Sequence, residues 1–238
     1  ERAVVAAKRA LENPAWRDMT QTARGKLLFK LADLIEQHAG RLGELETQDS
    51  GKLLAETATQ TKYVADYYRY YAGLADKLEG AVLPIDKPDM HVFTKRMPIG
   101  VVAAVVPWNA QMFLSATKLG PALAAGCAVI LKASEIAPIP MLEFAKLIDQ
   151  AGFPDGVVSV ITGDAENCSI PLTRHPQVDR IAFTGGPENI WKAEVIDETL
   201  FVLQEDSEDE LWISRDLGSS WETYEAPEDN ESENISHI

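Results

Sequence analysis

Four short segments hold the residues whose types could bind a ligand or take part in chemistry, and each segment follows an apolar run. They supply an amide, an ammonium group, carboxylates and glycines, which suit a polar ligand lying close to the backbone. No GxGxxG and no GxxxxGK[ST] pattern occurs, so neither the usual dinucleotide fingerprint nor a phosphate-binding NTPase loop is present. The segments are Pro107–Trp108–Asn109, Lys132–Ala133–Ser134–Glu135, Gly163–Asp164 and Thr184–Gly185–Gly186.

The elements that must position these segments are four apolar, β-branched runs separated by helical patterns. They are Val101–Val106, Ala128–Lys132, Val157–Thr162 and Arg180–Thr184. Strands without polar alternation, joined by helical crossovers, are typical of a parallel sheet that is covered on both faces. Right-handed crossovers predict an α/β fold with a doubly wound, Rossmann-like sheet. Ligands bind beyond the carboxyl ends of such strands, so the four segments should meet at one edge and form a site of the nucleotide-binding kind.

The residues before this sheet are expected to be helical. Leu27, Leu28, Leu31, Leu34 and Ile35 share one helical face, and the helix should end at His38, with a new one starting at Arg41. A further helix is expected from about 55 to 78. Its stripe of tyrosines indicates core or an oligomer interface rather than chemistry. Between 81 and 98, three prolines and the run from His91 to Arg96 predict an extended strand pair or a crossover into a second layer.

Charge and cysteine content exclude several classes of function. The net charge is −15, but residues 1–188 carry 20 basic and 22 acidic side chains, so the acidity lies in the last 50 residues. A nearly neutral body favours neither nucleic-acid nor membrane-surface binding. Cys127 and Cys168 form no CxxC pair and have no histidine at ligand spacing, so no disulfide framework and no metal site is expected. A cytoplasmic location fits best. The chain starts at Glu1 rather than Met, which leaves open a fragment, a processed chain or a lost leader.

Six motifs in order and in register make residues 1–188 resemble the aldehyde dehydrogenase superfamily. A single motif of this kind would be weak, whereas six together are specific. They are Pro98–Val101 followed by Pro107–Asn109, Lys118 with Gly120–Gly126, Lys132–Glu135, Gly152–Val157, and Phe183–Gly185.

The resemblance implies a nicotinamide cofactor that lies across the carboxyl edge of the sheet without a glycine-rich turn. Lys132 and Glu135 would hydrogen-bond the adenosine ribose, and the carboxylate favours NAD⁺ over NADP⁺ because it would repel a 2′-phosphate. The turn after Phe183 opens a helix whose amides could face the pyrophosphate. Departures from the family pattern are Gly186, where serine is usual, and Ala165 and Ser169, where glycines are common. The implied cofactor-binding residues are Val106, Pro107, Trp108, Lys132, Ser134, Glu135, Phe183, Thr184, Gly185 and Gly186.

Asn109 is the one residue of the chain to which the resemblance gives a role in the chemical step. Its amide would donate to the oxyanion formed when a cysteine thiolate attacks an aldehyde. The nucleophilic cysteine and the deacylating glutamate belong to later family segments that these 238 residues do not contain, and Cys127 and Cys168 align with non-catalytic positions. The expected reaction by lineage is NAD(P)⁺-dependent oxidation of an aldehyde to a carboxylate, without turnover by this chain itself. The family's full-length members are homo-oligomers.

After residue 188 the family pattern ends, and residues 189–238 are predicted to be an unrelated acidic tail. Ser214-x-Asp216-x-Gly218-x-x-Trp221 resembles an Asp-box, the hairpin motif of sialidase-like and sortilin-like propellers. One β-hairpin is expected there, followed by disorder over residues 222–238 because of their acidic and polar composition. Two alternatives to the enzyme therefore stay open: a non-catalytic cofactor-binding fragment, and a fusion or gene-model product whose tail derives from a propeller-type binding protein.

Overall fold

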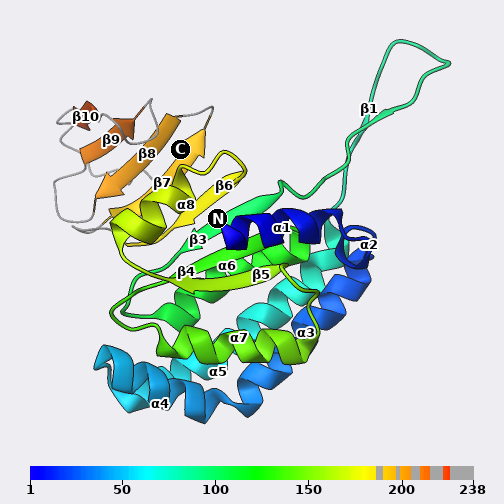
Figure 1. Cartoon of the computed structure of the whole chain (residues 1–238). Coiled ribbons are helices and arrows are strands. Elements are labelled where there is room, and N and C mark those ends of the chain that lie inside the picture. Colours follow the sequence, from blue (N-terminus) through cyan, green and yellow to red (C-terminus); the bar gives the residue numbers. More distant parts are fainter. Residues whose placement is uncertain (186–189, 197–198, 205–209, 215–221, 226–238) are drawn as a thin grey trace, which may run out of the picture. The chain divides into compact units, whose positions relative to one another are not determined.

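The computed structural model describes residues 1–185, 190–196, 199–204, 210–214 and 222–225 (Figure 1). The chain divides into two compact units, residues 1–184 and 185–238.

The first unit is built on a four-stranded parallel sheet in the spatial order β5-β4-β3-β6. Its strands are β3 (Val101–Val105), β4 (Ala128–Ala133), β5 (Val158–Thr162) and β6 (Arg180–Phe183), each ending within one residue of the predicted run. Helix α6 (Gln111–Ala125) connects β3 to β4, and α7 (Ile139–Ala151) connects β4 to β5. The prediction of a Rossmann-like α/β sheet is therefore confirmed. The strand order reverses direction between β3 and β6, which creates the crevice where such sheets bind ligands.

Alternate residues of the central strands serve two cores on opposite faces of the sheet. Val102 and Ala104 of β3 belong to a large core that includes side chains of α3, α5, α6 and α7. Val101 and Ala103 belong to a smaller core with Val4 and other residues of α1 (Arg2–Glu12) and α8 (Ile170–Thr173). Figure 1 shows the helices that cover the two faces, with α1 on one side of the sheet and α7 on the other. A strand that is buried on both faces has no polar alternation, which is why β3 is entirely apolar and β4 is apolar except for Lys132.

The helices α2 (Pro14–Arg17), α3 (Gln21–Gln37), α4 (Ala39–Ser50) and α5 (Leu54–Leu74) precede the sheet. The apolar face predicted around Leu31 is confirmed, since Leu28, Leu31 and Ile35 are fully buried. The break at His38 is also confirmed, but α4 begins at Ala39 rather than Arg41. Gly40 adopts no positive φ and fits inside the new helix, so it does not delay the start of α4.

The tyrosines of α5 divide between core and surface. Tyr68 is fully buried, whereas Tyr63 and Tyr70 are exposed. The aromatic stripe therefore contributes to the core in part only. After the short helix η1 (Ala75–Lys77), strands β1 (Val82–Leu83) and β2 (Val92–Phe93) pair antiparallel, so the first of the two alternatives for this segment, a strand pair, is confirmed.

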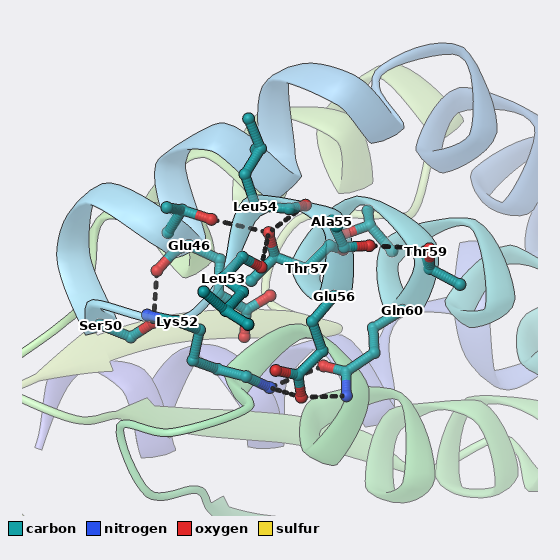
Figure 2. A network of polar contacts seen from close by, with 12 residues as sticks. Glu46, Ser50, Lys52, Leu53, Leu54, Ala55, Glu56, Thr57, Thr59 and Gln60 are labelled. Carbon is teal, nitrogen blue, oxygen red and sulfur yellow. Dashed lines mark hydrogen bonds and ion pairs between the residues drawn. The ribbon is translucent and has the colours of Figure 1, made fainter.

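A network of polar contacts joins α4 to α5 (Figure 2). The Ser50 hydroxyl donates to the Glu46 carbonyl, and the Lys52 ammonium contacts Glu56 at 3.1 Å. The hydroxyls of Thr47 and Thr57 lie 2.7 Å apart across the two helices. The contacts fix α4 against the layer that supports α6.

The second unit contains a four-stranded antiparallel sheet in the order β10-β9-β8-β7. The strands are β7 (Ile190–Ile196), β8 (Thr199–Gln204), β9 (Glu210–Ser214) and β10 (Glu222–Glu225). Two expectations are corrected by these strands: the unit holds more than one hairpin, and the prediction of disorder is wrong for residues 222–225. Thr223 and Tyr224 are strand-favouring types, and pairing with β9 overrides the acidic composition. Apart from Ser214, the residues of the Asp-box-like motif lie outside the described residues.

Within the described residues, no helix is long and apolar enough to cross a bilayer, and no group of histidine, cysteine and acidic side chains is arranged to hold a metal ion. Both cysteines are free thiols; Cys127 is buried and Cys168 is half-buried.

Candidate functional site

The carboxyl end of β3 carries Val106, Pro107, Trp108 and Asn109, directly before α6. Val106 is buried, and its amide donates to the carbonyl of Lys132 at 3.2 Å, which ties this turn to β4. Pro107 is half-buried, Trp108 is 46% exposed and Asn109 is exposed. The turn therefore offers an apolar wall and a free amide to a ligand at the edge of the sheet.

The carboxyl end of β4 carries an ion pair between a buried lysine and a partly exposed carboxylate. The Lys132 ammonium lies 2.6 Å from Glu135 Oε2, and their side chains are 7% and 47% exposed. The hydrogen bond from Lys132 holds the pKa of Glu135 below its usual value. Because Glu135 is half in solvent, it can exchange this contact for a ligand hydroxyl while Lys132 remains in place. Ser134 between them is buried.

The carboxyl end of β5 places Asp164 within electrostatic reach of Lys132. Asp164 caps the short helix η2 (Ala165–Ser169) by accepting from the Asn167 amide at 2.7 Å. Hydrogen bonds from Asn167 lower the pKa of Asp164, and the Lys132 charge adds to this effect. Burial raises the pKa of the nearby Cys168 thiol, so this cysteine is a poor nucleophile.

The carboxyl end of β6 carries Phe183 and Thr184, both half-buried. The Thr184 amide donates to the Val105 carbonyl at 3.0 Å. The Thr184 hydroxyl accepts a hydrogen bond from the Lys118 ammonium of α6. Gly185 has a φ of 97°, a conformation that glycine favours, and Gly186 lies outside the described residues.

The four predicted segments thus all follow parallel strands and end at the same edge of the sheet. Contacts in the structure join the β3 turn to β4 and the β6 end to both β3 and α6. Two further residues contact these segments without having been assigned a role from the sequence. Lys118 belongs to one of the family motifs, and a single lysine inside the apolar helix α6 is a usable signal. Gln111, whose side-chain oxygen accepts from the Ser134 amide at 3.1 Å, carries no signal in the sequence, because its partner is set by the tertiary structure.

The ammonium group of Lys118 should titrate near neutral pH. Burial lowers its pKa from 10.5 to about 8. Between these values the unfolded chain binds more protons than the native one, so Lys118 costs stability below pH 8, and this cost disappears as the pH rises from 8 toward 10.5. We expect Lys118→Met to raise the free energy of unfolding at pH 7 by about 1–3 kcal/mol. Urea unfolding from pH 7 to 10 measures this change in the free energy of unfolding. Lys62→Met, at an exposed position, is the control. Parallel pH profiles for Lys118→Met and the wild-type chain would contradict the expectation.

Known proteins of one family match the residues of the first unit. The model of the aldehyde dehydrogenase family matches residues 1–191. The chain is 64% identical over 187 residues to (Z)-2-((N-methylformamido)methylene)-5-hydroxybutyrolactone dehydrogenase of Acinetobacter baylyi. It is 42% identical over 192 residues to phenylacetaldehyde dehydrogenase of Pseudomonas fluorescens.

Solved structures agree with these relatives. The betaine aldehyde dehydrogenase of Staphylococcus aureus, a P449M variant in complex with NAD⁺, matches 78% of this chain with a TM-score of 0.75 and 37% identity. The match covers 38% of that enzyme. The two sequence relatives are also covered over 38% of their lengths, while 79% and 78% of this chain is matched. This chain therefore spans somewhat more than a third of the proteins it resembles.

The match of a family model to residues 1–191, the high identity to the dehydrogenase relatives and the shared fold of the first unit lead to one conclusion. The chain belongs to the aldehyde dehydrogenase family.

Proposed function

We propose that the first unit binds NAD⁺ at the carboxyl edge of its sheet, and that the protein's function is the NAD⁺-dependent oxidation of an aldehyde to a carboxylate. The observation that carries the proposal is the Lys132–Glu135 pair, in which the two side chains lie 2.6 Å apart directly after β4. It lies one strand away from the crevice between β3 and β6, where doubly wound sheets bind nucleotides.

The residues at this edge fit a dinucleotide. Lys132 would donate to a ribose hydroxyl and Glu135 would accept from one, which matches two neighbouring hydroxyl groups. Pro107 and Trp108 would form an apolar wall, and Thr184 and Gly185 would bring backbone close to the cofactor. When bound, NAD⁺ would accept a hydride from the substrate, which is thereby oxidised. The NAD⁺ complex of the Staphylococcus aureus relative supports the assignment.

Asn109 would act on the substrate rather than on the cofactor. Its amide is exposed at the start of α6, where it can donate to an oxygen that becomes negatively charged as a nucleophile attacks the aldehyde carbon. The sequence contains no cysteine after a GQ dipeptide and no ELGG-type glutamate. We therefore propose that these 238 residues alone bind cofactor without turning over an aldehyde. The competing function is that of a fusion product, in which residues 189–238 have a role of their own.

Cofactor binding is tested by calorimetric titration of NAD⁺ and NADP⁺ into the purified chain. We expect saturable NAD⁺ binding and weaker NADP⁺ binding, because the Glu135 carboxylate repels a 2′-phosphate. Glu135→Gln removes this charge and keeps the shape, so we expect it to reduce the preference for NAD⁺ by about tenfold, a difference of about 1.4 kcal/mol. Glu143→Gln, at an exposed ion pair of α7, is the control.

The outcomes separate the two functions. Absence of NAD⁺ binding by a chain that melts cooperatively would contradict the proposed site and leave the fusion product. Aldehyde-dependent reduction of NAD⁺ by the pure chain would contradict the proposed lack of turnover.

A further inference from the structure

A fully buried side-chain amide joins the start of α6 to the loop that follows β4. Gln111 is the first residue of α6, two positions after Asn109, and its exposed fraction is 0%. Its Nε2 donates to the carbonyl of Ala137, and its Oε1 accepts from the backbone amide of Ser134 at 3.1 Å. One side chain thus connects the turn that holds Asn109 to the segment that holds Glu135.

Both partners of this amide are inaccessible to water. Ser134 is 6% exposed and Ala137 is 2% exposed. A buried backbone amide or carbonyl that loses its partner retains its full desolvation cost, so the two hydrogen bonds hold the loop in one position. A carboxamide provides one donor and one acceptor at a fixed spacing, which matches the two loop groups.

The residue before α6 does not support the first turn of this helix. Ala110 provides no side-chain cap, although the first amides of a helix need acceptors. Glu46 of α4, labelled in Figure 2, is 1% exposed, and burial raises the pKa of its carboxyl. Its Oε1 has no hydrogen-bond partner within the described part of the chain. The two hydrogen bonds of Gln111 therefore link this turn to the loop after β4.

We propose that Gln111 is a positioning residue that fixes the Asn109 amide relative to the Ser134–Glu135 segment. A cofactor held by Lys132 and Glu135 and a substrate oxygen held by Asn109 would then keep a constant separation. This coupling rests on the proposed function of the site. The two hydrogen bonds from Gln111 to Ser134 and Ala137 form a tether between the start of α6 and the loop after β4. This tether is a property of the fold and can be measured without cofactor.

The test compares Gln111→Met with the wild-type chain by amide exchange and by NMR of the ¹⁵N-labelled protein. Methionine keeps the length and burial of the side chain and removes both hydrogen bonds. We expect the Ser134 amide to exchange about tenfold faster, while the rest of β4 stays protected. In the wild-type chain, NAD⁺ should shift the side-chain amide signal of Asn109. In Gln111→Met this response should be lost although NAD⁺ still binds.

Two controls separate positioning from general destabilisation. Gln150→Met, at an exposed position of α7, should change nothing. Gly152→Ala strains a left-handed glycine at the end of α7 opposite the loop that Gln111 binds, and it should reduce protection throughout the unit rather than at Ser134 alone.

Gln111→Glu provides a rescue that depends on pH. A protonated carboxyl can donate to Ala137 and accept from Ser134 as the amide does, whereas the ionised form has no donor. We expect wild-type exchange at Ser134 at low pH and fast exchange once the carboxyl ionises. If Gln111→Met fails to fold, Gln111→Glu still tests whether the side chain of residue 111 protects the Ser134 amide.

Wild-type exchange at Ser134 and an unchanged Asn109 response in Gln111→Met would overturn the proposal. The proposal would also be overturned if the exchange rate at Ser134 in Gln111→Glu, divided by the wild-type rate at the same pH, did not change with pH. Failure of the wild-type chain to bind NAD⁺ would instead overturn the proposed function, and the exchange rates at Ser134 would still decide whether Gln111 forms the tether.

Discussion

Replacing Gly156 with alanine is expected to lower the free energy of unfolding by about 3 kcal/mol. Gly156 has a φ of 83°, and a Cβ there would lie 2.5 Å from the Ala6 carbonyl oxygen and 2.9 Å from its carbon. These are backbone atoms of α1, so no side chain can move aside. Either the strained turn or α1 must shift, and a shift of α1 opens the core that Val4 and Ala7 form with the sheet.

Gly51→Ala is the matched control for this prediction. Gly51 has a φ of 78°, and a Cβ there would meet nothing within 4 Å. It shares the backbone strain of Gly156 without the contact, so we expect a loss of about 1 kcal/mol. Urea unfolding of both variants at 25 °C measures the difference. Equal losses would show that the approach of α1 to this turn contributes nothing.

Replacing Lys132 with methionine is expected to weaken NAD⁺ binding by about 100-fold, or about 2.7 kcal/mol. The ammonium is the buried member of the pair, with a side chain that is 7% exposed, so solvent cannot substitute for it. Its removal also frees Glu135 from its partner and leaves a carboxylate that repels the cofactor phosphates. Stability should fall little, because the cost of burying the ammonium is removed together with the ion pair. Calorimetric titration and a thermal melt of the same sample measure both effects.

Lys146→Met is the control for Lys132→Met. It tests whether the loss of any lysine that pairs with a glutamate three residues away weakens NAD⁺ binding. Lys146 contacts Glu143 at 2.6 Å with a spacing of three residues, as in the Lys132 pair, but its side chain is 66% exposed and lies on α7. We expect unchanged NAD⁺ affinity. A similar loss of affinity in both variants would point to general electrostatic attraction rather than to a site at the end of β4.

The four strands of the parallel sheet were predictable from the local pattern of apolar residues. The runs are mainly apolar, and β3 and β4 are buried at every position, whereas β5 and β6 are only partly buried. A mainly apolar run without polar alternation is a signature that needs no tertiary information. Residues placed directly after such runs must lie at the carboxyl edge, so the location of Lys132, Glu135 and Thr184 followed as well. The order and spacing of the motifs predicted the aldehyde dehydrogenase family, and the comparisons confirm this prediction.

The contacts within the site were not predictable in this way. Lys118 and Thr184 are 66 residues apart, and Gln111 and Ser134 are 23 apart, so neither pair has a helical or strand period to indicate it. The strand formed by residues 222–225 was missed for a related reason, since its stability comes from a neighbouring strand and not from its own composition.

The amino-acid sequence was sufficient for the fold class, the family and the edge of the sheet at which the four polar segments end, because these depend on periodicity and on residue order along the chain. Only the tertiary structure decided which polar groups are buried and with which partners. The buried Lys132, the lowered pKa of Lys118 and the Gln111 tether all arise from desolvation and from hydrogen bonds between distant segments, which exist only once the chain has folded.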